Sequence, residues 1–134
     1  MDNSAEDKIH IHELEIFARV GVSNQERAQP QRLTVNITFW PRVRVRDLGE
    51  DITRTIDYSA VCEETTRVAG ARRDKLIETL ADEIATHLLR TFPAREVTVE
   101  LRKFTLPHAQ YAAVIVNRRT VKSGVRKSTA GARS

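Results

Sequence analysis

A lysine stands at a position of the chain where an apolar residue is expected. Lys103 ends an alternating row whose preceding members are Val97, Val99 and Leu101. A lysine on the core-facing side of a strand is desolvated, which lowers its pKa and makes it a usable proton carrier. The alternative interpretation is a lysine whose ammonium group snorkels past the edge of the sheet. The residue pattern therefore marks Lys103 as a candidate catalytic residue with two open interpretations.

Three further side chains have a type and a place that suit chemistry. Glu78 lies at the edge of the apolar stripe of an expected helix. There its carboxylate either favours the helix dipole or accepts paired N–H donors in a cleft. Tyr58 precedes another expected helix and is either a packing residue or a stacking and proton-donating group. Glu26 lies in an expected loop, where isolated glutamates are mostly solvated.

The histidines and the single cysteine form no metal or nucleophile motif. His10 and His12 lie two residues apart on an expected strand, but a catalytic zinc site normally has three protein ligands. Neither His87 nor His108 has ligand spacing with that pair. Cys62 has no base partner in the pattern, and we expect a small buried side chain there. Because no phosphate-binding loop or nucleophile elbow is present either, we expect no metal and no cofactor.

The elements that must position these side chains begin with strands. Apolar residues between positions 9 and 16 alternate but change phase by one residue, which predicts a β-bulge near His12 and Glu13. Residues 20–31 are rich in turn-forming types and predict a long loop. Alternation over residues 33–39 predicts a strand that ends at Pro41.

Two helices and two strands are expected to follow. Residues 42–54 predict an irregular loop with one short turn, and Asp57 or Ser59 is expected to cap a helix that ends near residue 71. Asp74 is expected to cap a second helix, and alternation predicts strands over residues 97–101 and 111–116. The inner side of the first helix would carry Val61, Thr65, Val68 and Ala69. The apolar stripe of the second would be Leu76, Ile77, Leu80, Ala81, Ile84, Ala85, Leu88 and Leu89.

This order of elements predicts an α+β fold. Four antiparallel strands would form one sheet, with two consecutive helices on one of its faces, in the order ββααββ. A four-stranded sheet of this size has exposed edges, which are a liability unless another subunit pairs with them. We therefore expect the protein to form an oligomer.

Length and charge indicate one folded domain and a basic tail. The chain has 134 residues, of which 40% are hydrophobic and 30% charged, as in ordinary folded domains. Six cations and no acids follow Asn117, and without them 16 cations face 18 acids. We expect a domain over residues 1–118 and a disordered tail over residues 119–134, with no specific nucleic-acid binding. We also expect no membrane span and no secretory leader, and a single cysteine favours the cytoplasm.

Four separated segments together form a family pattern. They are residues 21–27 followed by Gln31, residues 55–58, residues 76–81 and residues 99–103. In this order and spacing the chain resembles the dihydroneopterin aldolase family over residues 7–118. That family has the tunnelling fold, in which subunits pair their sheets around a ring and two tetrameric rings commonly stack. The resemblance implies an oligomeric barrel, a tetramer or an octamer, with sites between subunits.

The resemblance also implies a reaction. Family members cleave 7,8-dihydroneopterin by a retro-aldol step into 6-hydroxymethyl-7,8-dihydropterin and glycolaldehyde, on the way to folate. They need neither a metal nor a Schiff base, because the pterin ring accepts the electrons. By resemblance, Glu78 anchors the pterin and Lys103 manages protons at the cleaved side chain, through water.

Further residues complete the implied site. Glu26 matches the acid that helps to hold Lys103. Tyr58 matches the tyrosine that a neighbouring subunit supplies. The backbone around the pocket would come from Thr55, Ile56, Asp57, Leu76 and Ile77.

Two positions depart from the common family pattern. Val20 precedes the glycine of the first segment where many members have histidine, and Phe104 follows Lys103 where many have proline. The related dihydroneopterin triphosphate epimerases share the four functional positions and also lack these two features. The alternatives are therefore an epimerase that reverses the same retro-aldol step and a pterin-binding module without turnover.

Overall fold

The chain follows the predicted order of strands and helices, with one helical turn added. The structure is a computed structural model and describes residues 6–121. Its main elements are β1 (Ile9–Ala18), α1 (Asn24–Arg27), β2 (Gln31–Pro41), α2 (Tyr58–Gly70), α3 (Ile77–Thr91), β3 (Ala94–Lys103) and β4 (Ala112–Arg119). Residues 1–5 and 122–134 lie outside the described residues. The tail was predicted to begin at residue 119, but Arg119 is the last residue of β4, where it pairs with Glu96 of β3.

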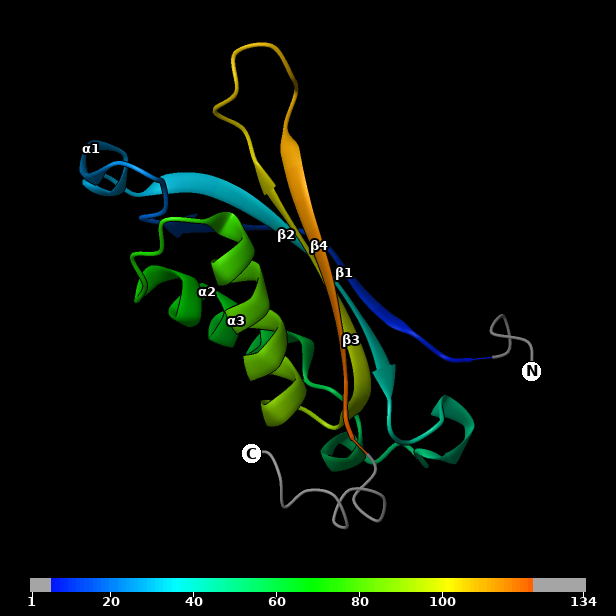
Figure 1. The fold of residues 1–134 in the computed structure, drawn as a ribbon. Coiled ribbons are helices and arrows are strands. Elements are labelled where there is room, and N and C mark those ends of the chain that lie inside the picture. The colour runs from blue at the N-terminus through cyan, green and yellow to red at the C-terminus, as the bar shows by residue number, and fades with distance from the viewer. Residues whose placement is uncertain (1–5, 122–134) are drawn as a thin grey trace.

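The four strands form one antiparallel sheet in the order β1-β2-β3-β4. Helices α2 and α3 lie together on one face of it (Figure 1). This confirms the predicted α+β fold. Because β1 and β4 stand at the two edges of the sheet, each presents one row of backbone groups that no other strand within residues 6–121 pairs.

The core lies between the sheet and the two helices. The inward rows of β2 and β3 are fully buried, which follows from the alternation that the sequence displays. These rows are Leu33, Val35, Ile37 and Phe39, and Val97, Val99 and Leu101. Helix α2 buries the four residues predicted for its inner side, and α3 buries Leu80, Ala81, Ile84, Ala85 and Leu88. The buried rows fix how β3 is seated, and with it the position of Lys103 at its end.

The predicted bulge in β1 is confirmed. Ile11 pairs with Ile37 and Leu14 with Val35, so two residues of β1 face Asn36 alone. Glu13 has a φ of 53° at this point, and its backbone N–H donates to Asn36 Oδ1 at 2.8 Å. The extra residue keeps the apolar side chains before and after the bulge on the helix side of the sheet.

The start of α2 is as predicted, but the start of α3 is not. The Asp57 carboxylate accepts hydrogen bonds from the backbone N–H groups of Ser59 and Ala60 and so caps α2. Asp74 does not cap α3, because both of its carboxylate oxygens bind Arg72. The helix begins three residues later at Ile77, and Leu76, which was predicted in its apolar stripe, is 48% exposed.

Two segments predicted as loops contain short helical turns. Residues 20–31 include α1, which begins because the Ser23 hydroxyl accepts the backbone N–H of Glu26 at 3.1 Å. Residues 42–54 contain two 3-10 turns, η2 (Val45–Asp47) and η3 (Ile52–Arg54), where one turn was expected. No helix within residues 6–121 has the length and apolar character needed to cross a membrane.

Candidate active site

Lys103 forms an ion pair with Glu26 at the end of β3. The Nζ atom of Lys103 donates to Glu26 Oε2 at 2.8 Å, and the two side chains are 20% and 35% exposed. The lysine continues the inward row of β3, but the core ends before it, and α1 brings Glu26 over the strand end. Both predicted residues therefore meet, although 77 positions separate them.

The carboxylate of Glu26 is held from several sides. Besides Lys103, the nearby backbone N–H of Val22 and side chain of Gln31 favour its charged form. The Lys103 contact is the largest of the effects that lower the pKa of Glu26 below its ordinary value of 4.5, and partial burial opposes them. Glu26 is therefore a carboxylate at neutral pH. Gln31 also donates through Nε2 to the Val20 carbonyl at 2.7 Å.

Because Gly21 has no side chain, the Glu26 side chain can pack against its backbone. Its φ is +156°, and a Cβ atom on Gly21 would lie 2.2 Å from the Cδ atom of Glu26. The backbone N–H of Gly21 donates to the Asp74 carbonyl at 3.1 Å. The loop that carries Glu26 is thus joined to the segment that leads into α3.

The start of α3 lies at the same end of the sheet as α1 and the end of β3 (Figure 1). Glu78 lies in the first turn of α3 and is exposed, and Ile77 is half-buried. We call Glu26, Lys103, Ile77 and Glu78 the lysine half-site.

Tyr58 and the three residues before it lie away from the lysine half-site, at the start of α2. Tyr58 is the first residue of α2 and is 58% exposed. Ile56 is buried, Thr55 is half-buried and Asp57 is engaged in the helix cap. We call these four residues the tyrosine half-site.

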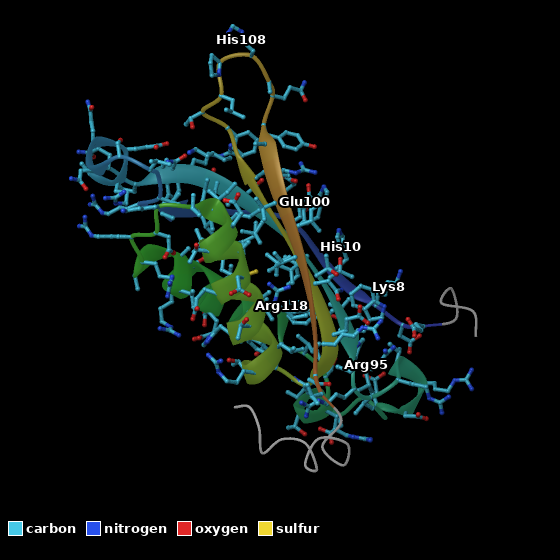
Figure 2. The ribbon with its side chains drawn as sticks, in the orientation of Figure 1. Lys8, His10, Arg95, Glu100, His108 and Arg118 are labelled. Carbon is cyan, nitrogen blue, oxygen red and sulfur yellow. The ribbon has the colours of Figure 1, made fainter. Side chains whose placement is uncertain are left out.

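A hollow lies beside Tyr58. Its volume is about 440 Å³, and it is lined by Tyr58 and Cys62 of α2 and by Lys8, Ile9, His10 and Ile11 at the beginning of β1. Figure 2 labels Lys8 and His10 on this stretch of the strand. Cys62 is half-buried rather than fully buried as predicted, because it borders this hollow.

The two half-sites do not meet within one chain. The tyrosine half-site adjoins the beginning of β1, whereas the loop with Glu26 follows its end. Lys103 is level with Ile16 of β1, because both residues pair with Leu33. The hollow borders β1 around His10, so at about 3.3 Å per residue the two half-sites lie roughly 20 Å apart along the sheet. A ligand of pterin size cannot touch both half-sites of the same subunit.

The histidines lie in three places, of which one holds the neighbouring pair His10 and His12. Among residues 6–121, no three His, Cys, Asp or Glu side chains gather as a metal site requires. His10 lies 2.8 Å from Thr38 Oγ1, and its ring is 5.7 Å from that of His12. His108 lies at the tip of the loop between β3 and β4, away from His10 (Figure 2). His87 contacts Glu64 at 2.7 Å, between α2 and α3.

Sequence reasoning missed a polar network on the face of the sheet opposite the helices. Arg102 donates to Glu100 at 2.9 Å and to Glu13 at 2.7 Å, and its guanidinium lies 4.4 Å from the Tyr111 ring centroid. The alternation in β3 marks these positions as outward-facing. It gives no sign of the partner Glu13, which lies 89 positions away in the chain.

A comparison with protein-family models gives the family. The model described as dihydroneopterin aldolase matches residues 9–117. This chain belongs to the dihydroneopterin aldolase family. The resemblance found in the four sequence segments is thereby confirmed.

Curated relatives and a solved structure agree with the family. The dihydroneopterin aldolase of Methylorubrum extorquens is 32% identical over 84% of this chain and 89% of its own length. That of Bacillus subtilis is 27% identical over 84% and 98%. The crystal structure of Escherichia coli dihydroneopterin aldolase in complex with neopterin has a TM-score of 0.77 at 26% identity, covering 84% of this chain and 98% of that one.

Proposed function

We propose that this protein is a dihydroneopterin aldolase of folate biosynthesis. It cleaves 7,8-dihydroneopterin into 6-hydroxymethyl-7,8-dihydropterin and glycolaldehyde. The observation that carries the proposal is the Lys103–Glu26 ion pair at the end of β3, in a chain of this family. The pair presents a proton carrier beside the start of α3, where a pterin anchor is expected.

The reaction needs a base and an acid. The base removes the proton of the 2′-hydroxyl group, the bond between C1′ and C2′ breaks, and C2′ leaves as the carbonyl carbon of glycolaldehyde. The electron pair of the broken bond passes into the pterin ring. The ring nitrogen N5 takes up a proton and releases it when a proton is added to C1′. Atoms and electrons balance without an outside oxidant or reductant.

Lys103 is suited to this proton traffic. An ammonium group has three N–H donors, and Glu26 accepts one of them. The others are available to water or to the side chain of the substrate. Glu26 holds the lysine in one direction, so its role is to orient Lys103 rather than to act on the substrate.

Glu78 is the proposed anchor of the pterin ring. Its carboxylate stands in the first turn of α3 and is exposed to a ligand. Two oxygens of a carboxylate match two N–H groups on the edge of an aminopyrimidine, and such charge-assisted pairs are strong and directional. The backbone of Leu76 and Ile77 borders the same place. Gln31 Oε1 is buried without a hydrogen-bond partner among the described residues, which leaves one more acceptor at this end.

Tyr58 of a neighbouring subunit is proposed to complete the site. The roughly 20 Å between the half-sites within one chain supports a site built by two subunits. The free edges of β1 and β4 offer a way to join the sheets in a ring, as a tetramer or as an octamer of two rings. The tyrosine would arrive with the backbone of Thr55, Ile56 and Asp57, and its hydroxyl would exchange protons with the intermediate.

The cleavage is proposed to proceed without metal or cofactor, in the cytoplasm. The pterin ring serves as the electron sink, so no Schiff base is needed on Lys103.

Purified protein with 7,8-dihydroneopterin, with and without a chelator, tests the proposal. Chromatography should show 6-hydroxymethyl-7,8-dihydropterin at the same rate in both samples. A rate that falls with the chelator would contradict metal independence. Formation of dihydromonapterin alone would assign the chain to the epimerases, and pterin binding without any turnover would make it a non-catalytic binding module.

A further inference from the structure

The one-turn helix α1 carries an arginine whose contacts point to a role in the reaction. We propose that Arg27 is a positioning residue, which fixes the Gly21–Val22 peptide and through it the Glu26–Lys103 pair. The inference rests on the proposed function for its effect on turnover. Its effect on Glu26 is measurable whether or not the protein is an aldolase.

Arg27 forms three hydrogen bonds with residues of the loop that precedes it. Its Nη1 atom donates to the carbonyl oxygens of Gly21 at 2.7 Å and of Val22 at 2.9 Å, and its Nη2 atom donates to Asn24 Oδ1. No carboxylate pairs with Arg27 within the described part of the chain. The guanidinium group is therefore bound to oxygens of the loop, two of them backbone carbonyls, and its rigid geometry sets where these oxygens lie.

One peptide unit links Arg27 to Glu26. The carbonyl of Gly21 and the N–H of Val22 belong to the same planar peptide, and in a trans peptide they point in opposite directions. Arg27 binds the carbonyl side, and the Glu26 side chain lies against Gly21, where the nearby N–H of Val22 helps to lower the pKa of its carboxylate. Glu26 in turn accepts from Lys103 Nζ. A chain of contacts thus runs from Arg27 through a rigid peptide to the lysine ammonium.

The local backbone cannot hold Glu26 by itself. Helix α1 has four residues, and isolated helices of such length are not stable in water. Gly21 is tied to Asp74 through its N–H, and the Glu26 side chain lies against the space where a Cβ atom of residue 21 would be. Arg27 supplies the third point of attachment, on the carbonyl side of the same residue.

Three variants test the proposal. Arg27→Ala removes all the contacts, and Arg27→Lys keeps a cation that can reach a carbonyl but has no fork. Arg19→Ala is the matched control, because Arg19 donates to the Ala28 carbonyl of the same loop and does not touch the Gly21–Val22 peptide. Thermal unfolding of each variant checks that it is folded.

Two readouts are followed. The first is the pKa of the Glu26 carboxyl, measured by NMR on protein labelled with ¹³C at glutamate Cδ. In Arg27→Ala it should rise towards its ordinary value of 4.5, because the contacts that lower it loosen. The second is turnover, where kcat should fall about tenfold and KM should change less, since a misplaced proton carrier affects the transition state more than binding. Arg27→Lys should lie between wild type and Arg27→Ala, and Arg19→Ala should stay within about twofold of wild type.

The outcomes separate a failure of the positioning role from a failure of the proposed function. Unchanged Glu26 titration and unchanged kcat in Arg27→Ala would overturn the positioning role and leave the proposed function intact. A shifted titration in a protein whose wild type does not cleave dihydroneopterin would keep the positioning role and overturn the proposed function. If Arg27→Ala does not fold, the same two readouts in Arg27→Lys decide, and values equal to wild type would overturn the role.

Discussion

The lysine half-site and the tyrosine half-site differ in how far one chain completes them. At the first, Lys103, Glu26 and the loop backbone satisfy one another within the chain. At the second, Tyr58 stands 58% exposed beside an open hollow of about 440 Å³. The difference teaches that the charged half of the site is built in advance by folding. The aromatic half is an exposed surface, which we propose is completed by another subunit.

The largest effect on turnover is expected from a substitution in the lysine half-site. Lys103→Met should lower kcat about a thousandfold, in line with the loss of a general acid and base, and should change pterin affinity much less. Lys103→Arg is the informative control, because arginine keeps the charge beside Glu26 but does not release a proton. Single-turnover kinetics and pterin titration measure the two effects. If Lys103→Arg retained the wild-type rate, Lys103 would serve as a charge and not as a proton carrier.

A smaller effect on turnover is expected from a substitution in the tyrosine half-site. Tyr58→Phe keeps the ring and removes the hydroxyl, so kcat should fall by about tenfold to a hundredfold while KM changes little. Tyr111→Phe provides the control, because Tyr111 stacks on Arg102 and belongs to neither half-site. Steady-state kinetics of wild type, Tyr58→Phe and Tyr111→Phe measures kcat and KM for the comparison. Equal kcat in wild type and Tyr58→Phe would remove the hydroxyl from the mechanism.

The smallest effect concerns stability and pH. The pKa of Glu26 is lower in the folded protein than its ordinary value of 4.5, so the pair with Lys103 stabilises the fold above that pH. The contribution is lost as the pH falls through the lowered value. Thermal unfolding of wild type and Lys103→Met should therefore differ by about 3 °C at pH 7, as for a partly exposed pair worth up to about 1 kcal/mol. The difference should shrink steadily as the pH is lowered below 4.5. A difference that grows on acidification would contradict this assignment.

Patterns of neighbouring residues predicted most of the fold. Alternation located β2 and β3, and the phase change in β1 located the bulge near Glu13. Asp57 was one of two residues predicted to cap α2, and it is the cap. The prediction failed where a residue had a competing partner. Asp74 has the right type for a helix cap, but Arg72 binds its carboxylate, and nothing in the local pattern reveals that choice.

The site was predictable only in part. The position of Lys103 in an apolar row drew attention to it, but its partner Glu26 lies 77 positions away and emerged only from the family resemblance. Arg27 was missed because its acceptors are backbone carbonyls, which have no sequence signature. The partner of Tyr58 is proposed to lie on another subunit, so no pattern within one chain identifies it.

Mixed oligomers test the two-subunit site most directly. Lys103→Met and Tyr58→Phe chains with different tags are expressed together, and oligomers that contain both are isolated by two affinity steps. If each site takes its lysine and its tyrosine from different subunits, about a quarter of the sites in a random assembly contain both intact residues. The account predicts about a quarter of the wild-type activity, far above either variant alone. Activity no higher than the average of the two separate variants would show that the site does not combine two subunits.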